Sequence, residues 1–380
     1  MLRKDMVSAF VDTIFCYIKR GQLLKPFKNL DQQIAILKRR GLNINDISYA
    51  KRYLLTNNYY DVINGYSKFF TVRNNNERYI SLAEFEEIKA VHLFDKEFKS
   101  ALLKALIEAE KHFKSVVAYR FSEKFPEPYA YLKTENFRKT KNFNEMSRIS
   151  KLIGNLTTII NSNIKKNHSN SIKHYYYSHG GVPFWVLCND MTFGQIVTFY
   201  ENLDDKLKEK IAFDLSSFLQ DNILNITGAS SNNIISVPTL SNFLKNANEF
   251  RNIAAHNNLL FRHRCWKNLK FQRWMPRNSN HCNKQGLYYV FLYLQCLLSA
   301  SQYATLHNTF LKRVTTLKKK LKSISISKIL LALDFPSDWD TCGKIPQSNS
   351  PKRIWKINID SVKSVSRAKA SRNRFKIKSH

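Results

Sequence analysis

The chain has 380 residues, of which 43% are hydrophobic and 13% aromatic, so it can bury a substantial core and is not a disordered protein. Lys and Arg number 61 against 29 Asp and Glu, which gives a net charge of +32. A field of that sign attracts polyanions, above all nucleic acid or an anionic membrane surface. Lysine-rich codon usage from an AT-rich genome is the plainer alternative, but it explains the shortage of acidic residues less well.

The cysteine pattern and the apolar segments bear on the compartment. Six scattered cysteines contain no CxxC pair, and the apolar stretch 7–18 is interrupted by Asp12 and lacks a cleavage-like site. The longest apolar stretch, 287–300, falls short of the ~18–20 residues that a membrane span needs. We therefore expect a cytoplasmic protein with reduced cysteines and no membrane contact.

Glycine (10) and proline (9) are scarce in the 380 residues, which favours long helices over many short strands. Residues 30–70 predict two short helices separated by Gly41, the first capped by Asp31 and the second by Asn45 or Asp46. A helix-turn-helix that reads DNA is one alternative for this unit. Residues 81–125 keep an apolar three-four spacing after a Ser81–Glu84 capping box, which predicts one long helix or two with a small break.

The second half continues in helices. Residues 136–172 are polar and predict either a helix with loose ends or an insertion. Gly180, Gly181 and Pro183 mark a turn before a helix from Phe184. The soft loop 227–238 precedes a helix from Thr239. An apolar helix over 287–305, a basic helix over 311–327 and a disordered basic tail over 351–380 are expected to follow.

These elements predict an all-α protein in three parts. Residues 1–135 would form an N-terminal helical lobe that contains the first long helix. Residues 136–345 would form a C-terminal helical lobe, and 346–380 a basic tail that either has no specific role or contacts nucleic acid.

The stretch RNIAAH places Arg251, Asn252 and His256 on the predicted helix that starts at Thr239. Arg251 falls on the apolar stripe of that helix, where an unpaired charge is costly unless it has a function. A cleft lined by guanidinium and imidazole suits a phosphodiester, because histidine can exchange a proton near neutral pH and arginine neutralises a phosphoryl transition state. The structural alternative is an arginine paired with a buried acid such as Glu110 and an ordinary surface histidine.

No metal or other cofactor is expected to take part in this chemistry. The chain shows no clustered acidic residues of the kind that two-metal nucleases use. His263, Cys265, His281 and Cys282 are conceivable zinc ligands, but their spacing matches no standard zinc pattern.

RNIAAH resembles the Arg-(x)4-His motif of HEPN-domain ribonucleases, and the chain as a whole is similar to the Abi-like (AbiD/AbiF) family of abortive-infection proteins. Six stretches carry the resemblance, from about residue 24 to residue 342. They are KPFKNLDQQIAILKRRGL (25–42), YYDVINGY (59–66), FDKEFKSALLKALIEAEKHFKSVVAY (94–119), PFWVLCNDMTFGQIVTFYENL (183–203), RNIAAHNNLLFRH (251–263) and DFPSDW (334–339).

The resemblance implies an all-helical HEPN-type bundle and a homodimer with a composite site. It also implies a toxin-like, metal-independent endoribonuclease in phage defence, with Arg251 and His256 catalytic, Asn252 supporting them, and RNA as substrate, with a small noncoding RNA as a further partner. The alternative is a non-catalytic RNA-binding HEPN protein of a defence or toxin–antitoxin system.

Overall fold

A computed structural model describes residues 26–73 and 75–347. The stretch 7–18, Cys16 and the tail over 351–380 lie outside these residues, and the division into two lobes stays a prediction. The regular structure of the described part is helical apart from one small hairpin, which confirms the all-α fold class. Its helices are α2 (Leu30–Arg39), α3 (Ile47–Asn57), α4 (Phe85–Lys124), α5 (Phe143–Ile164), α6 (Ser171–Ser178), α7 (Phe184–Leu187), α8 (Phe193–Glu201), α9 (Asp205–Thr227), α10 (Val237–Ala255), α11 (Leu287–Tyr293), α12 (Ala300–Lys320) and α13 (Ile326–Ala332), with several short 3₁₀ or π turns between them.

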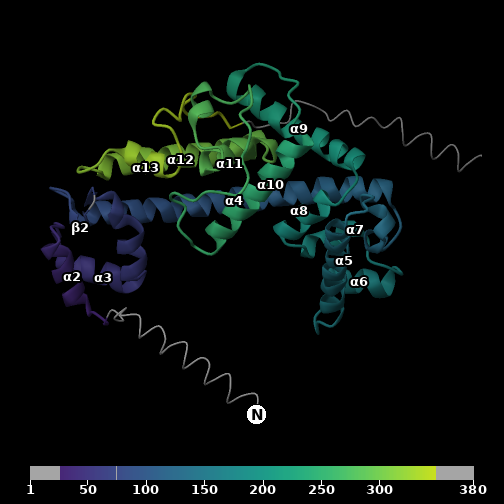
Figure 1. Cartoon of the computed structure of the whole chain (residues 1–380), viewed down its shortest axis with the longest axis horizontal. Coiled ribbons are helices and arrows are strands. Elements are labelled where there is room, and N and C mark those ends of the chain that lie inside the picture. The colour runs from purple at the N-terminus through teal and green to yellow at the C-terminus, as the bar shows by residue number, and fades with distance from the viewer. Residues whose placement is uncertain (1–25, 74, 348–380) are drawn as a thin grey trace, which may run out of the picture.

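Helix α4 is the scaffold of the molecule. It runs unbroken for 40 residues, a length of roughly 60 Å, so the alternative of two helices with a break is wrong. Helices α9, α10 and α12 pack against it, and Figure 1 shows α10 crossing the blue helix α4. Because neighbours cover it on several sides, its buried residues include polar ones, and three of these matter for the site below.

The two ends of α4 carry different elements (Figure 1). Helices α2 and α3 lie beside its beginning together with a small antiparallel hairpin, β1 (Thr71–Val72) and β2 (Asn75–Tyr79), which the sequence pattern did not predict. Helices α5 to α8 lie beside its other end. The sequence predicted the α2–α3 pair correctly, but Asn29 caps α2 in place of Asp31, while Asp46 caps α3 as expected.

The start of α4 also differs from the expected capping box. The helix begins at Phe85, and Glu87 rather than Glu84 supplies the returning carboxylate, which accepts the backbone N–H of Glu84 at 3.2 Å. Glu87 is buried because it also accepts the backbone N–H groups of Lys322 and Ser323 at 2.7 and 2.8 Å. A charge-assisted bond to each N–H joins the start of α4 to the chain that follows α12.

The expected apolar helix over 287–305 is interrupted. Helix α11 ends at Tyr293, a 3₁₀ turn follows at Leu294–Cys296, and α12 begins after the capping residue Ser299. The buried side chain of Asn222 donates to the carbonyls of Gln295 and Leu298 at 3.0 and 2.7 Å. These bonds satisfy backbone groups that the break leaves without helical partners. Across the described residues, no helix has the length and apolar character to cross a membrane.

Candidate functional site

Helix α10 carries the motif, and local sequence explains where it begins and ends. Gly228, with φ +72°, ends α9, and Pro238 lies in the first turn of α10, where a missing N–H costs nothing. The apolar stripe that the sequence predicted is buried, with Phe243, Leu244 and Phe250 fully inaccessible. The helix stops at Ala255, so His256 is its C-cap residue rather than part of its last turn.

Arg251 lies against α4, next to the buried carboxylate of Glu110. Its Nε is 3.6 Å from Glu110 Oε2, which makes an ion pair but is too long for a hydrogen bond. Glu110 is better paired with Lys114, at 2.8 Å. The partner named in the structural alternative is therefore present, yet the Arg251 guanidinium donates no hydrogen bond to any described residue. Its Nε–H is buried beside Glu110, whereas the terminal amino groups of the partly exposed side chain remain available to a ligand.

A cavity of about 920 Å³ opens beside Arg251. Glu110, Lys111 and Lys114 of α4 line it together with two aromatic side chains, Tyr119 and Trp185. About half of each aromatic side chain is exposed, Tyr119 at 54% and Trp185 at 49%. Cationic groups beside exposed aromatic rings suit a phosphate and an unstacked nucleobase.

Asn252 and His256 lie on the outside of the molecule. Both residues are exposed, and their side chains form no hydrogen bond or ion pair within the described chain. Neither lines the cavity beside Arg251. Within one chain, the structure therefore does not bring Arg251 and His256 into contact, and the imidazole is free to meet another molecule.

The backbone around His256 is held tightly, in contrast to its side chain. Asn257 adopts the left-handed conformation with φ +55°, and the N–H of Asn258 donates to the carbonyl of Ile253 at 2.9 Å. This is a Schellman motif. Its left-handed position is more often glycine, but asparagine also adopts that conformation. The turn fixes the direction in which the chain leaves His256.

A buried ionic cluster on α4 and the preceding segment supports this turn. Lys99 of α4 donates its ammonium hydrogens to the carbonyls of Asn257 and Asn258, at 3.2 and 3.4 Å. It also pairs with Asp95 at 2.9 Å, and Tyr66 donates its hydroxyl to the same carboxylate oxygen at 2.7 Å. Burial raises the pKa of Asp95, and the charge of Lys99 opposes that rise. We call Tyr66, Asp95 and Lys99 the anchor cluster.

Sequence reasoning missed the anchor cluster. Its residues lie inside two stretches that carried the family resemblance, 59–66 and 94–119. The available signal was an acid and a lysine four residues apart within the long predicted helix. That spacing is common on exposed helix faces, so only the packing of α10 against α4 distinguishes a buried pair from a solvated one.

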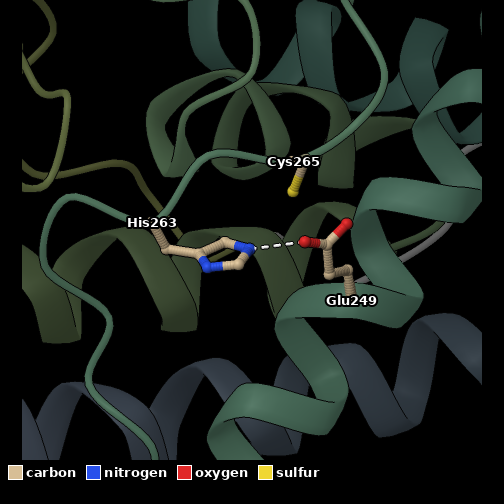
Figure 2. Close-up of side chains that lie close together, drawn as sticks. All are labelled: Glu249, His263 and Cys265. Carbon is tan, nitrogen blue, oxygen red and sulfur yellow. Dashed lines mark hydrogen bonds and ion pairs between the residues drawn. The ribbon is translucent and has the colours of Figure 1, made fainter. Parts of the chain in front are cut away.

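Two of the four zinc ligands considered from the sequence lie together in the structure, and the other two lie elsewhere. Figure 2 shows His263 and Cys265 beside Glu249 of α10, with the ligand atoms of the three residues all within 4.8 Å of one another. His263 Nε2 and Glu249 Oε1 are 2.6 Å apart. His281 and Cys282 do not join this group, so the four-residue zinc set considered from sequence is not assembled.

Comparison with known proteins gives one finding. The model of a family described as Abi-like protein matches residues 52–262, more than half of the chain. No curated protein and no solved structure matches. The match covers the anchor cluster, Glu110 and the whole Arg251–His256 motif, and it ends one residue before His263. The chain belongs to the Abi-like protein family.

Proposed function

We propose that this protein acts in abortive infection, as its family suggests, by cleaving RNA without a catalytic metal. In this proposal the chain is a HEPN-type endoribonuclease of the AbiD/AbiF kind, and Arg251, Asn252 and His256 are its catalytic residues. The observation that carries the proposal is the state of Arg251, whose guanidinium faces an open cavity with every hydrogen-bond donor unused. An arginine in that state at a cavity wall suits an anionic ligand.

The chemistry follows from the nucleophile that RNA itself carries. The ribose 2′-oxygen attacks the adjacent phosphorus, and the bond from phosphorus to the 5′-oxygen breaks. His256 takes the 2′-hydroxyl proton or delivers a proton to the leaving oxygen, and Arg251 stabilises the charge that collects on the phosphoryl oxygens. The products are a 2′,3′-cyclic phosphate and a 5′-hydroxyl.

A second copy of the chain would complete the site. The attacking 2′-oxygen and the leaving 5′-oxygen lie on opposite sides of the phosphorus, so one imidazole is not placed to act as base on the first and as acid on the second at the same time. His256 is exposed and lies apart from the cavity, so a partner subunit can bring its own motif alongside. We therefore propose a homodimer whose two motifs line one cleft, with RNA entering over the basic surface.

The test compares wild type, His256→Ala and His168→Ala, which removes an exposed histidine from the loop between α5 and α6. Each protein is expressed from a tight promoter while growth is followed and RNA 5′ ends are mapped. Cleavage by the purified proteins is then measured with and without EDTA, at a temperature below the unfolding of the chelated protein. We expect toxicity and cleavage with 5′-hydroxyl ends in wild type and His168→Ala, and loss of both in His256→Ala.

A second candidate function is RNA binding without cleavage, which the charge of +32 favours. In that case Arg251 and His256 only hold phosphate, and the bound RNA or a protein partner is the effector. If wild type and His256→Ala bind RNA equally and neither cuts it, with or without phage infection, the endoribonuclease proposal is overturned.

A further inference from the structure

Glu249, His263 and Cys265 bring three metal-binding side chains to one point on the side of α10. Glu249 and Arg251 are two positions apart on the helix, roughly 200° around its axis, so the group faces away from the cavity beside Glu110. Figure 2 shows the Cys265 sulfur pointing toward the gap between the His263 ring and the Glu249 carboxylate. A carboxylate, an imidazole and a sulfur therefore converge from a helix and from the segment that follows it.

The three side chains are held in place by contacts outside the group. The rings of His263 and Phe250 meet edge to face, with centroids 5.3 Å apart. The backbone N–H of Cys265 donates to the carbonyl of Gln285 at 3.0 Å. The side chain of Asn246, one turn before Glu249, donates to the carbonyl of Lys267 at 2.8 Å and ties this segment to α10. Such supports are typical of ligands whose geometry is set before the ion binds.

The donor set fits a soft or borderline divalent cation. Sulfur and imidazole nitrogen favour Zn²⁺, and a glutamate oxygen is an accepted third ligand. Bonds of about 2.0–2.3 Å arranged tetrahedrally put ligand atoms about 3.3–3.8 Å apart, so a cation needs only small movements within the 4.8 Å spread. Cys265 is buried, whereas the Glu249 and His263 side chains are each 28% exposed, which leaves a path for the ion and a place for water as fourth ligand.

We propose that Glu249, His263 and Cys265 form a zinc site that fastens the segment after His256 back onto α10. The ion binds Glu249 Oε1, His263 Nε2 and Cys265 Sγ. Binding displaces the proton from His263 Nε2, and the ring stays a neutral imidazole with its one remaining proton on Nδ1. The Cys265 thiol gives up its proton to solvent and binds as the thiolate. The site is structural, because it lies on the opposite side of α10 from Arg251 and its ligands include none of the proposed catalytic residues. It also crosses the end of the family match, with His263 and Cys265 beyond it.

The experiment uses the full-length, untagged protein, freed of metal by chelation and dialysis. Zn²⁺ is titrated by calorimetry and the melting temperature is followed with and without the ion. We expect one Zn²⁺ per chain and a rise in melting temperature. Co²⁺ should give an absorption band from thiolate-to-metal charge transfer, a signature that carboxylate and imidazole alone do not produce.

Ligand variants and matched controls assign the site. Cys265→Ser and His263→Gln should each lose Zn²⁺ binding and the melting shift, whereas Cys282→Ser should keep both. Cys342→Ser tests a second group, formed by His307, Asp340 and Cys342. The proposal is overturned if wild type takes up no Zn²⁺, or if Cys265→Ser binds like wild type. Loss of binding in Cys342→Ser alone would assign the ion to the second group and also overturn it. Metal content and melting temperature do not depend on RNA cleavage, so this result is independent of the proposed function.

Discussion

The anchor cluster and the motif differ in the state of their charged groups, although both meet at the end of α10. Tyr66, Asp95 and Lys99 are buried and bonded to one another and to the turn at Asn257. Arg251 and His256 keep donors and acceptors free, one at a cavity wall and one at the surface. Rigidity in this region therefore comes from the backbone and its buried support, which leaves the motif side chains open to a ligand.

The largest effect should come from breaking the anchor cluster. Lys99→Met removes the ammonium that pairs with Asp95 and leaves a buried carboxylate without its partner. We expect a loss of about 3–5 kcal/mol in the free energy of unfolding, measured by urea titration. Lys104→Met, at an exposed position of the same helix, should change it little, and Asp95→Asn combined with Lys99→Met should recover part of the loss. Equal stabilities for the Lys99 and Lys104 variants would refute this role.

Removing Arg251 should separate activity from stability. Arg251→Ala leaves Glu110 paired with Lys114, so the free energy of unfolding should change by less than about 1 kcal/mol. Cleavage should fall by about 100-fold or more, because the proposed donor to the phosphoryl transition state is lost. Arg273→Ala, which removes an exposed arginine outside the motif, is the control for lost charge. A fall of similar size in that variant would argue against a specific role.

Substitutions of Asn257 test the left-handed turn itself. Alanine is strained at φ +55°, so Asn257→Ala should cost about 1–2 kcal/mol of unfolding free energy. Asn257→Gly relieves that strain and should stay close to wild type. The difference in unfolding free energy between the two variants, measured by thermal or urea unfolding, gives the cost of the left-handed backbone conformation at position 257. Indistinguishable stabilities would mean that the left-handed turn does not form in solution.

The smallest expected effect concerns pH and His92, whose ring accepts or donates a hydrogen bond with Tyr53 near the anchor cluster. Burial lowers the pKa of His92, and the charges of Lys96 and Lys99 lower it further. Unfolding therefore takes up a proton below about pH 6.5, so stability should be lost as the pH falls from there toward the folded-state pKa. His92→Gln should flatten that slope in urea titrations between pH 7 and 5.5.

Asp334 acts in the opposite direction over part of this range, because burial raises its pKa to about 6. Its contribution to stability is lost as the pH rises through that value. The dependence of the unfolding free energy on pH must therefore be compared between wild type and His92→Gln. An unchanged slope in the variant would exclude His92 as the group responsible.

The sequence predicted α4 and α10 well, because their apolar spacing and the proline at the start of α10 are local signals. It predicted the first residue of α4 poorly, since Glu87 gains its role from Lys322 and Ser323, far along the chain. The anchor cluster and the Glu249–His263 pair were out of reach for the same reason. Local patterns show where a helix lies and which of its faces is apolar, whereas the partners of buried charges depend on which helices pack together.

The continuity of α4 limits which insertions and deletions this chain can accept during evolution. Lys99 supports the turn after His256, and Glu110 lies beside Arg251. Both ends of the motif are therefore positioned by side chains of the same helix, α4. A single inserted or deleted codon between Lys99 and Glu110 would rotate one support by about 100° relative to the other. Loops of this protein can lengthen and shorten, but that stretch of α4 must keep its residue count.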